Sequence, residues 1–282
     1  MPEIERHMRL GTALGLMVAC VAVSATAQEE RKAYSNAITV TAVRDPVDKS
    51  YRKMIRGMEL FEELRALAPA ASLRYKLLPR KPNTNMDEIE LAVDANSFTI
   101  PVAVAADRTF TLERNQKALD EDASVTSNRK ALSMTWRAEV RTPGLPPDTR
   151  RLGDLRLECH VGMEADLVSN VRQVSSFFGP ATNARLRERG FCERDKARYL
   201  YFAERPLAGV TLVHGARREA VPVDRLYAGL SRNELTKEDL PHCDCEVLID
   251  RTYFLPLGDR SWPDGTLVEF QYADRPLRLE FR

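Results

Sequence analysis

His242, Cys243 and Cys245 place three reactive side chains within four positions, in the segment PHCDCEVLID. Imidazole and thiolate groups bind zinc, and thiolates also bind copper(I). The segment therefore fits a metal site, a thiol redox site or part of a disulfide framework. The C-x₂-C and H-x₃-H spacings common in zinc sites are missing, and C-x-C differs from the C-x-x-C of thioredoxin-like redox units. The cellular compartment then becomes the deciding property.

The N-terminus predicts export. Leu10–Ala22 is almost wholly apolar or small, and Ala25 and Ala27 fit the A-x-A pattern that precedes signal-peptide cleavage. Residues 1–27 are therefore predicted to be a signal peptide, removed to leave a mature chain that starts near Gln28. The apolar run is shorter than the roughly 20 residues of a spanning helix, so we expect no transmembrane anchor after processing.

Two alternatives concern this leader. Translation from Met8 rather than Met1 would give the net basic start that a signal peptide favours, because it removes two glutamates. Val18-Ala19-Cys20 also resembles a bacterial lipoprotein cleavage box, and processing there would leave a lipid anchor at Cys20. In each case the expected location is periplasmic or secreted.

Export places the remaining cysteines in an oxidising compartment. Cleavage leaves Cys159, Cys192, Cys243 and Cys245, and an even count there favours disulfides over metal. A direct Cys243–Cys245 bond would close a very small ring. We therefore expect each of these two to bond further back, one to Cys159 and one to Cys192.

The metal alternative keeps His242, Cys243 and Cys245 as ligands, completed by Cys159-His160. The chain would then be a periplasmic metal-handling protein. The disulfide interpretation requires no cofactor and no metal.

Composition limits the partners. Hydrophobic residues make up 44% of the chain and charged ones 29%, which is typical of a soluble globular protein. The net charge is only +1, so nucleic acid is not an expected partner. The expected partner is an envelope component or protein whose identity the sequence does not give.

The clearest predicted element is a long amphipathic helix over about 46–67. Asp45 supplies an N-cap and Pro46 suits the first helical position. An apolar stripe recurs at three- and four-residue steps. Its members are Tyr51, Met54, Ile55, Met58, Phe61, Leu64 and Leu67.

The rest predicts an α+β fold that is predominantly β, with antiparallel, sandwich-like sheets. One or two helices are expected near 165–190, at 165–178 and 183–188. Glu113 to Asn128 reads as polar, with room for a short helix. Strands are predicted at 37–43, 73–77, 89–93, 98–104 with Pro101 at an edge or bulge, 109–112, 130–140, 153–159, 198–203, 209–214, 219–223, 245–249, 267–272 and 277–281.

The segment 142–148 is rich in proline and glycine and is the most obvious break in the chain. It is either a linker between a β-rich domain with one helix (28–142) and an α+β domain (149–282), or a rigid surface loop within one domain (28–282).

Val102 to Leu112, VAVAADRTFTL, resembles the strand–Asp-Gly-turn–strand hairpin of transthyretin-like and carboxypeptidase-regulatory-like sandwiches. Arg108 stands where that hairpin usually has glycine. The chain as a whole is similar to uncharacterised secreted proteins of Gram-negative bacteria. The resemblance implies a β-sandwich and an extracytoplasmic location, and it carries no catalytic residue.

Tyr253, Arg260 and Trp262 are the candidate ligand-binding residues, because aromatic and arginine side chains dominate recognition surfaces. The alternative is that the rings pack in the core and that Pro263-Asp264-Gly265 is simply a turn.

No catalytic residues are predicted. The sequence lacks the G-x-S-x-G, H-E-x-x-H, Walker A and G-x-G-x-x-G motifs. The leading interpretation is a non-enzymatic, exported cell-envelope protein with a binding or structural role. An envelope-polymer hydrolase that uses acidic residues of the C-terminal third is the remaining alternative.

Overall fold

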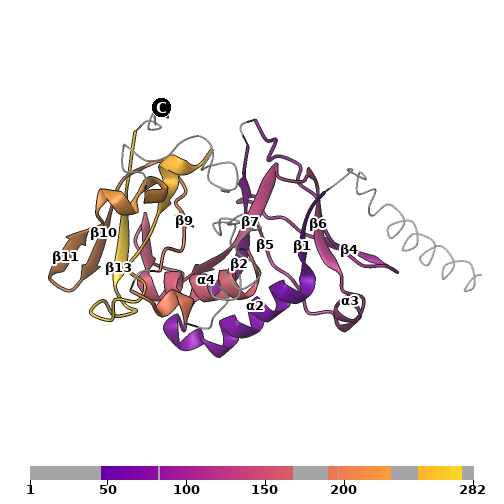
Figure 1. The fold of residues 1–282 in the computed structure, drawn as a ribbon, viewed down its shortest axis with the longest axis horizontal. Helices are drawn as coiled ribbons and strands as arrows, with labels where there is room; N and C mark the ends of the chain where they lie inside the picture. Colours follow the sequence, from indigo (N-terminus) through magenta and orange to yellow (C-terminus); the bar gives the residue numbers. More distant parts are fainter. Residues whose placement is uncertain (1–45, 82, 168–189, 196, 230–246, 275–282) are drawn as a thin grey trace, which may run out of the picture. The chain divides into compact units, whose positions relative to one another are not determined.

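The chain folds as α+β, with mostly antiparallel strands in four sheets, as the sequence predicts (Figure 1). A computed structural model describes residues 46–81, 83–167, 190–195, 197–229 and 247–274. These residues contain three α-helices: α2 (Tyr51–Glu63), α3 (Gln116–Asp120) and α4 (Leu152–Glu164). The strands are β1 (Pro46–Ser50), β2 (Ser72–Pro79), β3 (Leu91–Asp94), β4 (Thr99–Val102), β5 (Thr109–Phe110), β6 (Ser124–Lys130), β7 (Met134–Arg141), β8 (Thr149–Arg151), β9 (Tyr201–Phe202), β10 (Leu207–His214), β11 (Arg217–Ala220), β12 (Thr252–Tyr253) and β13 (Leu267–Tyr272).

Two of the sheets are built from strands of the first half of the chain, and the other two are built from later strands. The first two have the orders β1-β6-β3-β4 and β5-β2-β7. The others are β11-β10-β13-β8 and the short pair β12-β9. Pro101 lies in β4 at the edge of its sheet, as predicted, where its missing N–H interrupts no ladder.

Helix α2 buries Tyr51, Met54, Ile55 and Phe61 of the predicted apolar stripe, but it begins later and ends earlier than predicted. It ends at Glu63, so the predicted end near Leu67 is wrong, and Arg65–Leu67 forms a 3₁₀ turn. Pro46–Ser50 forms strand β1, which pairs with β6, so the predicted helix start at Pro46 is wrong. The cap is Ser50, whose Oγ accepts the Lys53 N–H at 3.4 Å. The stripe packs under β7, where Trp136 Nε1–H donates to Met54 Sδ at 3.4 Å.

Helix α4 replaces a predicted strand. Gly153–Cys159 lies inside this helix, so the strand prediction at 153–159 is wrong. Leu157 packs in the hydrophobic cluster of the first half, whereas Leu155 packs in the cluster of the second half. Side chains of α4 therefore pack in both hydrophobic clusters, and the described residues belong to one compact unit.

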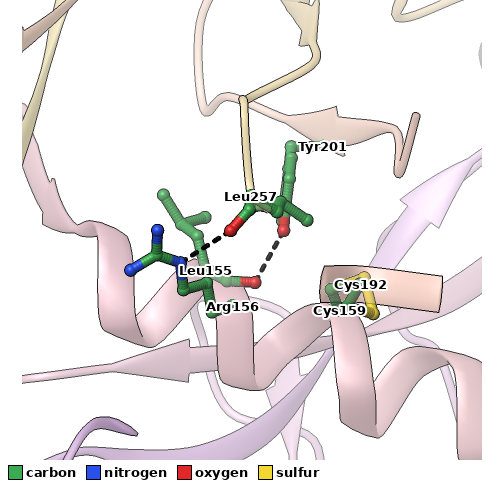
Figure 2. The surroundings of a disulfide bond; sticks show 6 residues. All are labelled: Leu155, Arg156, Cys159, Cys192, Tyr201 and Leu257. Atoms are coloured by element: carbon green, nitrogen blue, oxygen red, sulfur yellow. Dashed lines mark hydrogen bonds between the residues drawn. A yellow bond between two sulfur atoms is a disulfide. The ribbon is translucent and has the colours of Figure 1, made fainter. Parts of the chain in front are cut away.

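Helix α4 also anchors the second half through a buried arginine (Figure 2). Arg156 donates from Nε to the Leu257 carbonyl at 2.9 Å and from Nη1 to Asp264 Oδ1 at 2.6 Å. Its Nη2 donates to the carbonyls of Asp259 and Trp262 at 2.8 and 2.9 Å. The guanidinium therefore fixes the whole loop between β12 and β13.

One disulfide ties α4 to the residues just after 190. Cys159 bonds to Cys192, and both are buried (Figure 2). The expected pairing of these two with Cys243 and Cys245 is therefore wrong, since neither sulfur is available to them. Cys243 and Cys245 lie outside the described residues.

The predicted hairpin at 102–112 does not form. The turn itself is present: Ala105 N–H donates to the Thr109 carbonyl at 2.8 Å, and Arg108 takes the left-handed conformation (φ 61°) that glycine would favour. However, β4 pairs with β3 while β5 pairs with β2, so the flanking strands belong to different sheets.

Several other predictions have clear outcomes. The strand predictions at 73–77, 209–214 and 267–272 are confirmed by β2, β10 and β13. Strand β6 arises in a segment that the sequence reads as polar. The strand predicted at 245–249 does not form in its described part, because 247–248 is a turn and Ile249 begins a 3₁₀ turn, Ile249–Arg251; residues 245–246 lie outside the described residues. The strands predicted at 37–43 and 277–281 and the helix at 183–188 lie outside the described residues, as does most of the helix at 165–178. None of the described helices has the length and apolar character needed to cross a bilayer.

Gly153 is required where α4 begins. A Cβ added there would lie 2.1 Å from the Leu67 carbonyl oxygen and 2.9 Å from Asp264 Cβ. Gly153→Ala is therefore expected to lower the free energy of unfolding by about 2 kcal/mol, as overpacking does. Gly265→Ala is the matched control, since nothing lies within 4 Å of its added Cβ. Urea unfolding of both variants measures the difference, and equal stabilities would contradict this packing.

Candidate functional site

Many polar side chains gather around a cleft of about 630 Å³, here called the main cleft. It lies among the ends of β2 and β7, the segment around β9 and residues 247–251. Its volume is in the range of small-molecule sites, about 300–1,000 Å³. Its lining includes Lys76, Lys81, Asp107, Arg108, Arg137, Glu139, Arg141, Arg150, Glu158, Tyr199, Tyr201, Phe202, Ala203, Glu204 and Arg251.

A smaller cavity of about 240 Å³, here called the side pocket, adjoins the main cleft. The loop 142–148 forms one wall, and Tyr253, Phe270 and Tyr272 contribute aromatic rings. The two cavities share five residues and are therefore neighbours. The shared residues are Arg141, Arg150, Phe202, Ala203 and Glu204.

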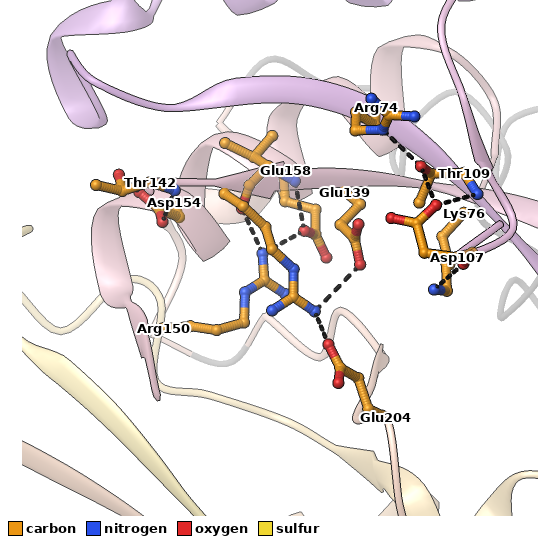
Figure 3. A network of polar contacts seen from close by, with 12 residues as sticks. Arg74, Lys76, Asp107, Thr109, Glu139, Thr142, Arg150, Asp154, Glu158 and Glu204 are labelled. Carbon is orange, nitrogen blue, oxygen red and sulfur yellow. Dashed lines mark hydrogen bonds and ion pairs between the residues drawn. The ribbon is translucent and has the colours of Figure 1, made fainter. Parts of the chain in front are cut away.

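A buried ion pair stands where the cavities meet (Figure 3). Arg150 Nη2 lies 2.6 Å from Glu158 Oε2, and both side chains are less than a tenth exposed. The Val140 N–H donates to Glu158 at 2.9 Å, and the Val140 carbonyl accepts from Arg150 at 2.5 Å. The pair therefore joins β7, β8 and α4.

The buried pair shifts both pKa values. Burial raises the pKa of Glu158 above its usual value, against the opposing charge and hydrogen bond of Arg150. Burial alone would lower the pKa of Arg150, but the charge and hydrogen bond of Glu158, together with the charges of Tyr253 and Glu139, outweigh burial and raise that pKa. The arginine therefore remains cationic, and the carboxylate depends on its partner to stay ionised.

Arg141 makes a second ion-pair group, which is more exposed than the first. Its Nη2 lies 3.2 Å from Glu139 Oε1 and 2.7 Å from Glu204 Oε1. The Glu204 side chain is 59% exposed, so water competes for this contact. An exposed pair of this kind contributes only about 0–1 kcal/mol, which makes Glu204 an exchangeable partner of Arg141.

Three neighbouring tyrosine rings contribute to the lining of the cavities. Tyr199, Tyr201 and Tyr253 follow one another at ring-centroid distances of 4.8 and 5.3 Å. Tyr201 Oη donates to the Leu155 carbonyl at 2.6 Å, whereas Tyr253 Oη hydrogen-bonds no other group in the described residues. Burial raises the pKa of Tyr253, so its phenol stays neutral and keeps a proton to donate.

The main cleft has more basic than acidic side chains. Seven lysine or arginine residues and four aspartate or glutamate residues line it. The acids are engaged: Glu158 pairs with Arg150, while Glu139 and Glu204 pair with Arg141. Hydrogen bonds from Thr109 lower the pKa of the fourth, Asp107. The lining therefore favours an electron-rich or anionic ligand.

The structure separates the three predicted ligand-binding residues. Trp262 is buried, and the Arg217 guanidinium lies 3.6 Å from its ring centroid. Tyr253 is also buried but lines the side pocket. Arg260 is exposed, 3.7 Å from Glu193. Both rings thus pack in the core, as the alternative proposed, and only Tyr253 reaches a cavity. The predicted turn at Pro263 forms, with the Thr266 N–H donating to the Pro263 carbonyl.

Sequence reasoning missed Arg141, Arg150 and Glu204. They lie on β7, on β8 and just after β9, far apart in the sequence and with no motif spacing between them. The only local signal was the proline-rich loop 142–148, which the sequence marked as a break and which forms a wall of the side pocket.

The metal alternative loses one candidate ligand. Cys159 is bonded to Cys192 and has no thiolate to offer. Within the described ranges, no group of three or more His, Cys, Asp or Glu residues is arranged to hold a metal ion. His242, Cys243 and Cys245 lie outside those ranges.

In the comparisons with known proteins, no family model, curated protein or solved structure matches this chain. Its function must therefore be argued from its own residues.

His160, next to the disulfide, predicts a pH dependence of stability. Burial lowers the pKa of His160, while the charge of Glu193 opposes this shift and that of Arg260 adds to it. The unfolded chain therefore binds this proton more readily than the folded chain does. The free energy of unfolding is therefore not reduced by His160 above the unfolded pKa of about 6.5, and it falls as the pH drops below that value.

His160→Gln should flatten that loss, measured as free energies of urea unfolding between about pH 7.5 and about pH 5. His214→Gln, at an exposed position on β10, is the matched control. The same pH slope in wild type and His160→Gln would contradict the assignment.

Proposed function

We propose that this chain is an exported cell-envelope protein that binds a ligand in the main cleft and has no catalytic role. The observation that carries the proposal is the cleft itself, with its ligand-sized volume, aromatic rings and predominantly basic lining. The Cys159–Cys192 disulfide is consistent with an oxidising, extracytoplasmic location.

The state of the acidic groups favours binding over hydrolysis. General acid catalysis at neutral pH requires a carboxyl group with a raised pKa that can reach the substrate. In the main cleft burial raises the pKa of the Glu158 carboxyl group, but its Oε2 already accepts from Arg150 and from the Val140 N–H. Glu139 and Glu204 are both held by Arg141.

Ala203 allows the cleft to be blocked, because it lines both cavities. We expect Ala203→Trp to abolish binding of small molecules that bind the wild-type mature chain. Ala216→Trp, on the exposed turn between β10 and β11, is the matched control and should bind as wild type does.

The measurement is ligand-observed NMR with a panel of sugars, amino acids, dipeptides and nucleosides. Binding by wild type and by Ala216→Trp but not by Ala203→Trp supports the proposal. If no compound binds, or if Ala203→Trp binds equally well, the cleft is not a ligand site.

A further inference from the structure

The side pocket holds two buried hydrogen-bond donors that have no acceptor among the described residues. Arg150 Nε and Tyr253 Oη are buried, and neither hydrogen-bonds another group in the described residues. Both residues line the side pocket, with 6% and 0% of their surfaces exposed. Buried donors normally have a partner, so the pocket is built to receive a group with acceptor oxygens.

A third donor lies at the boundary with the main cleft. Arg141 Nη2 already contacts a carboxylate, Glu204, whose side chain is more than half exposed. Glu204 therefore shows how a carboxylate sits against Arg141. Because Glu204 is solvated, an incoming carboxylate can replace it at little cost.

The remaining walls specify the rest of the ligand. Phe270 and Tyr272 present stacked rings with centroids 6.2 Å apart, and Pro146 and Pro147 belong to the opposite loop. Most of the pocket's lining is polar, so these rings leave room only for a small apolar or aromatic body beside a polar group. The volume of about 240 Å³ limits that body to roughly one ring or a short aliphatic chain.

We infer that the side pocket binds the carboxylate group of a small organic acid. In this arrangement Arg150 Nε–H and Tyr253 O–H donate to the carboxylate, and Arg141 exchanges Glu204 for it. The inference rests on the proposed binding function and specifies its ligand class. A hydrogen bond from a guanidinium to a carboxylate is charge-assisted and therefore stronger than one between neutral groups.

Benzoate and benzamide are suitable probes because they share size and shape but differ in charge. Titration of the mature chain by calorimetry is expected to show saturable binding of benzoate, with benzamide at least about tenfold weaker. A second titration compares Gly-Gly-Phe, which has a free C-terminal carboxylate, with its C-terminal amide. If Gly-Gly-Phe binds more tightly than benzoate, the carboxylate that the pocket binds is that of a peptide C-terminus.

Two substitutions test the named contacts. Tyr253→Phe removes the unpartnered hydroxyl and is expected to weaken benzoate binding by about tenfold without lowering the thermal midpoint. Tyr227→Phe is the matched control, since Tyr227 Oη bonds the Leu207 carbonyl and lines neither cavity. Glu204→Gln frees Arg141 and is expected to strengthen benzoate binding by about threefold.

The inference is overturned if benzoate does not saturate, if benzamide binds equally well, or if Tyr253→Phe and Glu204→Gln leave the affinity unchanged. The proposed function would survive any of these results if other compounds of the panel bind wild type and Ala203→Trp abolishes their binding. If Ala203→Trp does not affect the binding of any panel compound, the proposed function is overturned as well.

Discussion

Replacement of Glu158 by glutamine is expected to lower the free energy of unfolding by about 3–5 kcal/mol, which makes it one of the two most damaging substitutions we predict. The change keeps the side-chain shape but leaves the Arg150 guanidinium buried without a counter-charge. Arg150 is only 6% exposed, so water cannot replace the lost carboxylate. Urea unfolding at neutral pH measures the loss.

Glu269→Gln is the matched control, because Glu269 pairs with Arg218 at 2.5 Å where both side chains are at least a third exposed. Its expected cost is about 0–1 kcal/mol. Equal effects at positions 158 and 269 would show that the buried pair is not a structural element.

The partner substitution gives a different, pH-dependent result. In Arg150→Met the buried Glu158 has lost its counter-charge, but it can become neutral by binding a proton. Burial already raises the pKa of this carboxyl group, which favours the neutral form. The folded Glu158 then binds a proton more readily than the unfolded one does. The cost of Arg150→Met should therefore be smaller near about pH 5 than near about pH 8, because protonation neutralises the buried carboxyl group at the lower pH.

The double variant Arg150→Met/Glu158→Leu should cost less than the sum of the two single variants, by about 1–3 kcal/mol. Simple additivity would mean that the two groups do not interact.

The second large effect is expected at the disulfide. The double variant Cys159→Ala/Cys192→Ala opens a loop closed over a sequence separation of 33 residues. The chain-entropy relation gives a loss of about 3–4 kcal/mol for a loop of this length. Both sulfurs are buried beside α4, so their removal also leaves small voids in the core of the second half.

Chemical unfolding with and without a thiol reductant measures this loss. Reduced wild type should match the double variant, and reductant should change the double variant far less. A loss below about 1 kcal/mol would contradict a structural role for this bond.

Segments whose burial follows one simple period were predictable from sequence. The stripe of α2 and the strands β2, β10 and β13 each have one face toward a core, so their apolar residues recur at helix or strand spacing. The antiparallel α+β class follows from these elements and from the turns between them.

Helix α4 shows why other segments were not predictable. Leu155, Leu157 and Cys159 alternate with polar residues as in a half-buried strand, but the structure buries both sets. Arg156 and Glu158 are satisfied by residues distant in the chain, so period alone cannot distinguish this helix from a strand.

The predictions of the start of α2 and of the disulfide pairing were wrong for a related reason. Pro46 suits a first helical turn, but pairing with β6 outweighs that local preference. The Cys159–Cys192 bond depends on where residues 190–195 lie against α4, which no spacing between cysteines specifies. The cavities depend in the same way on Arg141, Arg150 and Glu204, which only the fold brings together.

The proposed envelope role requires export, and an oxidising extracytoplasmic location is consistent with the disulfide. Export is tested most directly by non-reducing peptide mapping of the chain recovered from fractionated producing cells. We expect the extracytoplasmic fraction to contain a mature chain that starts near Gln28, with the peptides of Cys159 and Cys192 linked to each other. A full-length chain in the cytosolic fraction, with both cysteines alkylated as free thiols, would contradict this account.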